Sequence, residues 1–219
     1  MQDFPNSGKY QFFRDTLLPT IGIKKLSDKN RPVSEARRKH FLESGTKLIN
    51  LLYKHPSVVY YTIFNEGWGQ FSSDEMYSFF KGKDLSRVFD STSGWFWQKK
   101  SDVDSIHIYF RKVKLPKRSG RPIVLSEFGG YSWKVNNHSF NSGQNYGYKL
   151  FNSKEELTKA LIELYERDVI NLIPSGLAGA ILTQVSDVED ETNGLFTYDR
   201  QVVKVDEEEI IELMKKVKY

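Results

Sequence analysis

Residues 122–131 read PIVLSEFGGY, an apolar run followed closely by a carboxylate and two glycines. The apolar run Ile123–Leu125 predicts a buried strand, and Glu127 then lies at the carboxyl end of that strand. A carboxylate is costly to bury unless it is paired or hydrogen-bonded. The position of Glu127 therefore indicates a role in function. The alternative interpretation is an ordinary strand-end residue that is bonded to an arginine or a loop amide.

Four other short runs predict strands of the same kind. Val58–Phe64 shows almost no polar alternation, which is typical of a strand buried on both faces. Shorter strands are expected at Ser86–Asp90, Ser105–Tyr109 and Ala178–Leu182. Together with the strand at Ile123–Ser126, these short buried strands indicate parallel pairing with crossover connections.

Helices are expected between and around these strands. Their ranges are residues 34–55, 74–81, 153–169 and 206–218. Ser153 followed three residues later by Glu156 is a capping box, and acidic residues open the last helix while lysines close it, as the helix dipole favours. The alternation of strands and helices predicts an α/β fold.

A second glutamate follows the strand at Val58–Phe64. The sequence there reads Asn65-Glu66-Gly67, so Glu66 also lies at a strand's carboxyl end, where active sites of (β/α) barrels are found. Two glutamates converging about 5 Å apart are what a retaining glycosidase requires. Asn65 has its own role in this reading, because an amide beside the acid can bond a sugar 2-hydroxyl; its alternative is a turn residue.

The composition restricts the class of protein. The chain has 219 residues with 32 basic and 28 acidic side chains, a net charge of +4 and 14% aromatic residues. Its densest basic segment, Arg111–Arg118, lies between two expected strands and predicts an exposed connection; a nucleic-acid contact is the alternative, but no nucleic-acid motif accompanies it. No apolar run is long enough to span a bilayer. Neither nucleic acid nor membrane is expected as a partner.

Metal and redox chemistry are also restricted by the residue types present. There is no cysteine, and the four histidines lack metal-ligand spacing, so neither a metal nor a cofactor is expected. The N-terminus shows no signal-peptide pattern, which favours a soluble protein of the cytoplasm.

Five motifs carry a family resemblance: IFNEGWGQF (63–71), DSTSGW (90–95), HIYF (107–110), VLSEFGGY (124–131) and TQVSDVEDETNGLFTYDR (183–200). Together they resemble glycoside hydrolase family 2, the β-galactosidase and β-glucuronidase family, and in particular its (β/α)8 TIM-barrel catalytic domain. The resemblance implies a retaining β-glycosidase in which Glu66 is the general acid/base and Glu127 is the nucleophile.

The resemblance also implies a set of substrate-binding residues. Tyr109 is expected to hydrogen-bond the nucleophile and keep it ionised. Asn65 and His107 are expected to reach sugar hydroxyls, although His107 fits equally well as a satisfied core histidine. Tryptophans that can pack on a pyranose ring are the remaining candidates: Trp68, Trp95 and Trp133. For each of them ordinary packing is the alternative.

Two departures from the family pattern shape the expectation. Family members often end their last strand with a tryptophan, whereas this chain has Thr183-Gln184. A complete barrel takes about 250 residues, and the Asn-Glu strand is normally its fourth. We therefore expect residues 1–219 to form a single, partial TIM-barrel domain that lacks about the first three strands and belongs to the C-terminal portion of a larger multidomain enzyme.

An incomplete barrel has physical consequences. Its open edges would expose backbone donors and acceptors, so self-association through them is expected, together with weak or absent hydrolysis of a β-glycosidic carbohydrate substrate. The competing hypothesis is a non-catalytic carbohydrate-binding or assembly module derived from a glycosidase barrel. The distance between the carboxyl groups of Glu66 and Glu127 distinguishes the two.

Overall fold

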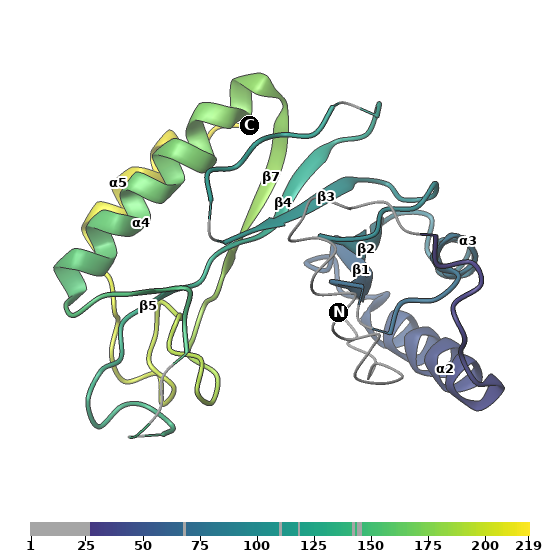
Figure 1. Ribbon diagram of the computed structural model, residues 1–219, viewed down its shortest axis with the longest axis horizontal. Coiled ribbons are helices and arrows are strands. Elements are labelled where there is room, and N and C mark those ends of the chain that lie inside the picture. The colour runs from purple at the N-terminus through teal and green to yellow at the C-terminus, as the bar shows by residue number, and fades with distance from the viewer. Residues whose placement is uncertain (1–26, 68, 110, 118, 142, 144–145) are drawn as a thin grey trace. The chain divides into compact units, whose positions relative to one another are not determined.

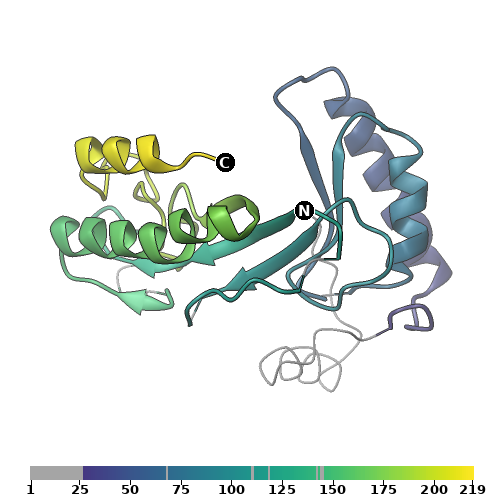
Figure 2. The same cartoon turned by 90° about the horizontal axis from the view of Figure 1, so that it is seen from above.

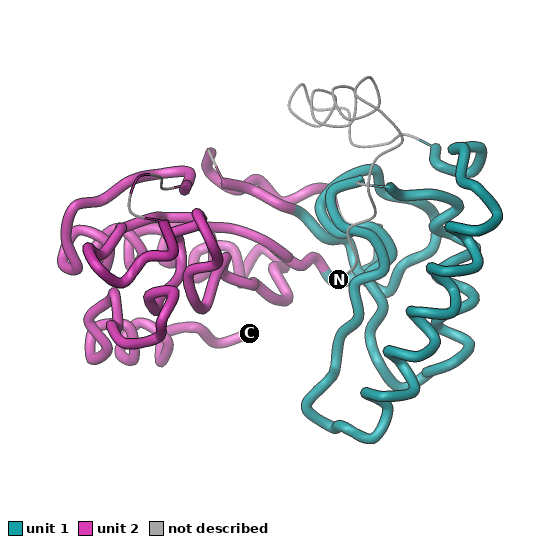
Figure 3. The backbone as a smooth tube through the Cα atoms, turned by 90° about the horizontal axis from the view of Figure 1, so that it is seen from below, with its two compact units in different colours: residues 1–106, 119–122 teal, residues 107–118, 123–219 magenta. Residues whose placement is uncertain are grey.

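A computed structural model describes residues 27–67, 69–109, 111–117, 119–141, 143 and 146–219. The chain divides into two compact units (Figure 3). Unit 1 comprises residues 1–106 and 119–122, and unit 2 comprises residues 107–118 and 123–219. The expected α/β architecture with parallel strands is confirmed, and each unit is built around its own sheet.

Unit 1 is a parallel strand pair covered by helices. Strands β1 (Tyr60–Asn65) and β2 (Val88–Ser93) pair in parallel, with Asn65 opposite Ser93 at their carboxyl ends. Helix α3 (Ser73–Lys81) connects them, and α2 (Glu35–Leu52) precedes them. Both helices lie along one face of the pair (Figure 2). The strand ends are thereby fixed on a βαβ scaffold.

Aromatic rings form the core of unit 1. Phe41 from α2 stacks on Phe64 from β1 with ring centroids 4.9 Å apart, and Phe71 and Phe80 meet Phe41 edge-on. All four rings are at most 4% exposed. Such burial contributes on the order of 2 kcal/mol per side chain and holds β1 immediately before the Asn65-Glu66 turn.

Unit 2 contains the strand that carries Glu127. Its three-stranded sheet has the order β3 (Asp104–Ile108), β4 (Ile123–Gly129) and β7 (Leu177–Thr183), and β4 and β7 run parallel. Strand β3 crosses the boundary of the units, so that His107 and Ile108 belong to unit 2. The carboxyl ends of β4 and β7 therefore lie beside each other.

Two helices cover this sheet, and two minor strands form a separate small sheet. Helices α4 (Lys154–Asp168) and α5 (Glu207–Lys216) run side by side (Figures 1 and 2). The 3-10 helix η1 (Ile170–Ser175) joins α4 to β7. The two-residue strands β5 (Tyr131–Ser132) and β6 (Lys149–Leu150) pair in parallel beyond the end of β4.

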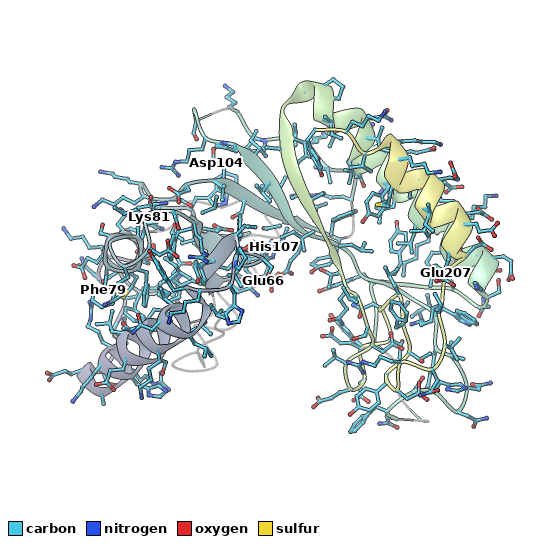
Figure 4. All side chains as sticks on the ribbon, turned by 180° about the vertical axis from the view of Figure 1, so that it is seen from behind. Glu66, Phe79, Lys81, Asp104, His107 and Glu207 are labelled. Carbon is cyan, nitrogen blue, oxygen red and sulfur yellow. The ribbon has the colours of Figure 1, made fainter. Side chains whose placement is uncertain are left out.

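The helix starts follow the expected capping chemistry. The Ser153 hydroxyl accepts from the Glu156 amide at 3.1 Å, and the Glu156 carboxylate accepts from the Asn152 amide at 2.9 Å, one residue earlier than in an ideal capping box. Asp206 caps α5, whose acidic first turn includes Glu207 (Figure 4). The predicted helices are confirmed within a few residues of their ends.

The main boundary difference concerns β2. The sequence predicted a strand at Ser86–Asp90, but β2 runs to Ser93 through small hydroxyl residues that are at most 3% exposed. Ser105 explains part of this burial, because its hydroxyl donates to Asp90 at 3.0 Å and accepts from the Gly94 amide at 3.3 Å. Small hydroxyl residues can therefore occupy core positions that an apolar pattern does not reveal.

The described strands form separate sheets of two and three strands rather than a closed barrel. The basic connection between β3 and β4 exposes Arg111, Lys112, Lys114 and Lys117, as expected. Among the described helices, none has the length and apolar character needed to cross a membrane.

One buried ion pair in unit 1 gives a test of the fold. Arg87 donates to Asp84 at 2.6 Å and to the carbonyls of Tyr53 and Val58, so it ties the end of α2 to the segments before β1 and β2. The Asp84 side chain is 0% exposed. Burial alone would raise the pKa of Asp84, but hydrogen bonds from Ser86 and Arg87 outweigh it and lower the pKa from 3.8.

Replacing Arg87 by Met should lower the free energy of unfolding by about 3–5 kcal/mol, because Asp84 is left buried without its cation. The depressed pKa of Asp84 in the folded state stabilises the wild type above about pH 4, and this contribution is lost as the pH falls through the folded pKa. Urea unfolding between pH 3 and 7 measures both effects. Lys215→Met, which removes an exposed pair with Glu212, is the matched control and should change little.

Candidate active site

The carboxylate of Glu127 accepts from neighbouring side chains at the carboxyl end of β4. The Tyr109 hydroxyl donates to Glu127 Oε2 at 2.5 Å, and His107 Nδ1 lies 3.3 Å from the same oxygen. The Glu127 side chain is 15% exposed and that of His107 only 1%. The site thus holds a largely buried carboxylate with donors fixed on the adjacent strand and the residue after it.

Tyr109 acts as a permanent hydrogen-bond donor. Burial raises the pKa of Tyr109 most, and the negative charge of Glu127 and the hydrogen bond to it raise it further. Thr183 Oγ1 lies 3.1 Å from the Tyr109 oxygen. Because the phenolic proton is used for Glu127, we assign Thr183 as donor to Tyr109. The three residues form a chain of hydrogen bonds that favours the ionised form of the carboxylate.

The two glycines after Glu127 make room for other side chains of unit 2. Gly129 and Gly130 have φ values of +96° and +63°, which disfavour other residues. A Cβ atom at Gly130 would lie 2.2 Å from the Tyr148 ring, and one at Gly129 would lie 2.7 Å from Leu182. Tyr148 in turn stacks on Tyr109 with ring centroids 4.1 Å apart. Sequence reasoning missed Tyr148, which no local pattern marks.

The other candidate carboxylate follows β1 in unit 1. Glu66 is partly buried and has φ +51°, a left-handed conformation that costs a non-glycine residue about 1–3 kcal/mol. Its amide donates to the carbonyl of Ser93 at 3.0 Å, which fixes the turn to the end of β2. Asn65 is buried, and its Oδ1 has no hydrogen-bond partner among the described residues.

The remaining sequence candidates have different surroundings. Trp95 follows β2 and Trp133 follows β5, and both are partly buried. Trp68 lies outside the described residues. His107 is buried, and its Nδ1 lies 3.3 Å from Glu127 Oε2; its expected contact with a sugar hydroxyl stays a prediction.

The units divide the candidate residues into two groups. Asn65, Glu66 and Trp95 belong to unit 1, whereas His107, Tyr109, Glu127 and Trp133 belong to unit 2. Each group is described within its own unit, so the convergence of Glu66 and Glu127 stays a prediction. Within unit 2, the Tyr109 hydroxyl donates to the carboxylate of Glu127, and such a donor favours the charged form of a carboxyl group.

Comparison with known proteins was informative at the level of structure. No protein-family model matches the chain. No curated protein matches it in sequence.

Several solved structures do match the chain. One is the β-D-glucuronidase of Dictyoglomus thermophilum, with a TM-score of 0.55 and 16% identity over 100% of this chain and 44% of that chain. Another is the β-glucuronidase of Parabacteroides merdae, with a TM-score of 0.55 and 13% identity over 87% of this chain and 28% of that chain. Bacteroides uniformis β-glucuronidase 3 gives a TM-score of 0.54 and 14% identity, over 86% of this chain and 29% of that chain.

The chain therefore spans less than half the length of these relatives. At such low identity the likeness concerns the fold. The family resemblance expected from the sequence is confirmed at that level: the structural neighbours of this chain are β-glucuronidases.

Proposed function

We propose that the protein is a retaining β-glycosidase that acts on a carbohydrate by double displacement. The hydrogen bond from Tyr109 to Glu127 carries the proposal, because a nucleophilic carboxylate must be ionised and this donor favours the ionised form. The carboxylate lies at the end of a parallel strand in a fold similar to that of β-glucuronidases, which supports the same reading.

The proposed reaction uses the two glutamates in two steps. Glu127 attacks the anomeric carbon while Glu66 donates its proton to the departing glycosidic oxygen, which breaks the glycosidic bond and leaves a glycosyl-enzyme. Glu66 then takes a proton from water, the water oxygen attacks the anomeric carbon, and the carboxylate of Glu127 leaves. Among the described residues the Oδ1 of Asn65 has no hydrogen-bond partner, which supports a role for that side chain in bonding a sugar hydroxyl.

We propose further that the parallel strands belong to a single (β/α)8-type barrel domain that residues 1–219 represent in part. The likeness to less than half of each neighbouring β-glucuronidase supports this. Strand β7 is at one edge of its sheet, and Ile181 on it is 50% exposed, which is compatible with an open edge that associates with another chain.

Replacing Glu127 by Gln in the full-length protein should reduce turnover of an aryl β-glycoside on the order of 10⁴-fold or more, since the amide cannot form the glycosyl ester. A fluorinated mechanism-based glycoside should label the wild type at Glu127, as peptide mass spectrometry would show. A label on another residue would overturn the mechanism. Saturable sugar binding without label or turnover would instead identify a binding module.

Tyr109→Phe tests the donor separately, because the ring and its stacking on Tyr148 are kept. Loss of the hydroxyl disfavours the ionised carboxylate of Glu127. The acidic limb of the pH profile should therefore move to higher pH than in the wild type. The acidic limb of the kcat/KM profile measures this shift. Tyr146→Phe alters an exposed residue whose ring meets that of Tyr148 edge-on, and it should leave the limb in place.

The 219-residue chain alone should hydrolyse aryl β-glycosides weakly or not at all, since a partial barrel lacks much of the ring of sugar contacts. Its mass in solution, measured by light scattering, should rise with concentration as open edges pair. A monomeric chain with turnover typical of glycosidases would contradict the partial-barrel proposal.

A further inference from the structure

The turn that carries Glu66 is held by a residue far from it in sequence. Arg31 is 9% exposed, and its Nη1 donates to the carbonyl of Gly67 at 3.1 Å. Its guanidinium also lies 5.1 Å from the centre of the Phe96 ring. That ring fills the space beside Gly67, where an added Cβ would lie 2.3 Å from it. Arg31 thus contacts both the turn and the ring packed against it.

Gln70 connects the same groups from the other side. Its side-chain amide donates to the carbonyl of Phe96 at 3.1 Å and to Asp28 Oδ2 at 2.8 Å, and its backbone amide donates to the carbonyl of Gly67 at 3.3 Å. Gln70 is 1% exposed and Asp28 is 2% exposed. The same Asp28 oxygen accepts from the first amide of α3 at 3.1 Å. The turn is therefore connected to a helix start as well as to the strand ends.

The backbone around these contacts has an unusual, left-handed conformation. Glu66 and Phe96 have φ values of +51° and +53°, and Gly67 and Gly69 also have positive φ. A glutamate and a phenylalanine rarely adopt this conformation unless their surroundings impose it. Glu66 and Phe96 both have this unusual conformation, and both adjoin the same buried hydrogen-bond network. This indicates that the conformation of the turn determines where the Glu66 side chain lies.

We propose that Arg31 and Gln70 are positioning residues for Glu66, and this inference rests on the proposed role of Glu66 as the general acid/base. They act through the Gly67 and Phe96 backbone rather than through contact with substrate. Their loss should allow Glu66 to leave its left-handed conformation and move its carboxyl group away from the glycosidic oxygen. Proton transfer depends on hydrogen-bond reach, so a displacement of about 1 Å is enough to impair it.

Leaving-group dependence gives a readout that general destabilisation does not produce. Phenyl β-glycosides need protonation of the departing oxygen, whereas 2,4-dinitrophenyl β-glycosides depart with little help. In the full-length enzyme, Arg31→Met should lower kcat/KM about 10- to 100-fold on the phenyl substrate, within the range of general acid catalysis, and by no more than about 3-fold on the dinitrophenyl substrate. Arg31→Lys, which keeps a charged donor, should recover part of the loss.

Arg38→Met is the matched control. Arg38 also lies over a phenylalanine ring, that of Phe71 at 5.2 Å, and donates to Ser72 and Glu75 rather than to the turn. It should affect both substrates equally. Equal losses on both substrates for Arg31→Met, in a protein with wild-type circular dichroism, would overturn the proposal.

Gln70→Met carries the test if Arg31→Met does not fold, because Arg31 and its contacts with the turn remain. It should show the same selective loss on the phenyl substrate, and an equal loss on both would count against the proposal. Glu66→Gln separates this inference from the proposed function. If that variant lacks leaving-group selectivity, Glu66 is not the acid/base; if it is selective while the Arg31 and Gln70 variants are not, only the positioning role fails.

Discussion

A charged carboxylate at the end of a buried strand needs fixed donors, and the hydrogen bond from Tyr109 to Glu127 meets this constraint. The sheet order β3-β4-β7 is what makes it possible. Strand β3 leads directly into Tyr109, β4 carries Glu127, and β7 ends in Thr183, whose hydroxyl lies 3.1 Å from that of Tyr109. Three neighbouring strands thus bring three hydrogen-bonding groups together, with the Tyr109 hydroxyl between the other two.

The same constraint explains the glycines that follow Glu127. A donor is useful only if its ring is held in place, and Tyr148 holds Tyr109 by stacking on it. Tyr148 can approach only because Gly130 has no Cβ. The two glycines therefore allow close packing around Tyr109, because both have positive φ and neither has a side chain.

The sequence predicted the repeating features of the fold and missed those that depend on distant residues. Apolar runs located β1, β4 and β7, and Ser34 and Ser153 cap their helices as expected. The extension of β2 through Ser91–Ser93 was missed because hydroxyl residues carry no apolar signal. Arg31 and Gln70 were missed for a related reason. They bond backbone carbonyls, and because every residue has a backbone carbonyl, no residue type in the sequence marks such a contact.

The fold likeness to the structural neighbours and the contacts of the loop after β7 concern different parts of the chain. The likeness is carried by strands and helices, whereas specificity is set by the loops beyond the strand ends. Just after Thr183, Gln184 donates to Glu191 at 2.9 Å and to Asn193 at 2.7 Å. The shared fold therefore does not determine the polar contacts of this loop, which depend on this chain's own side chains.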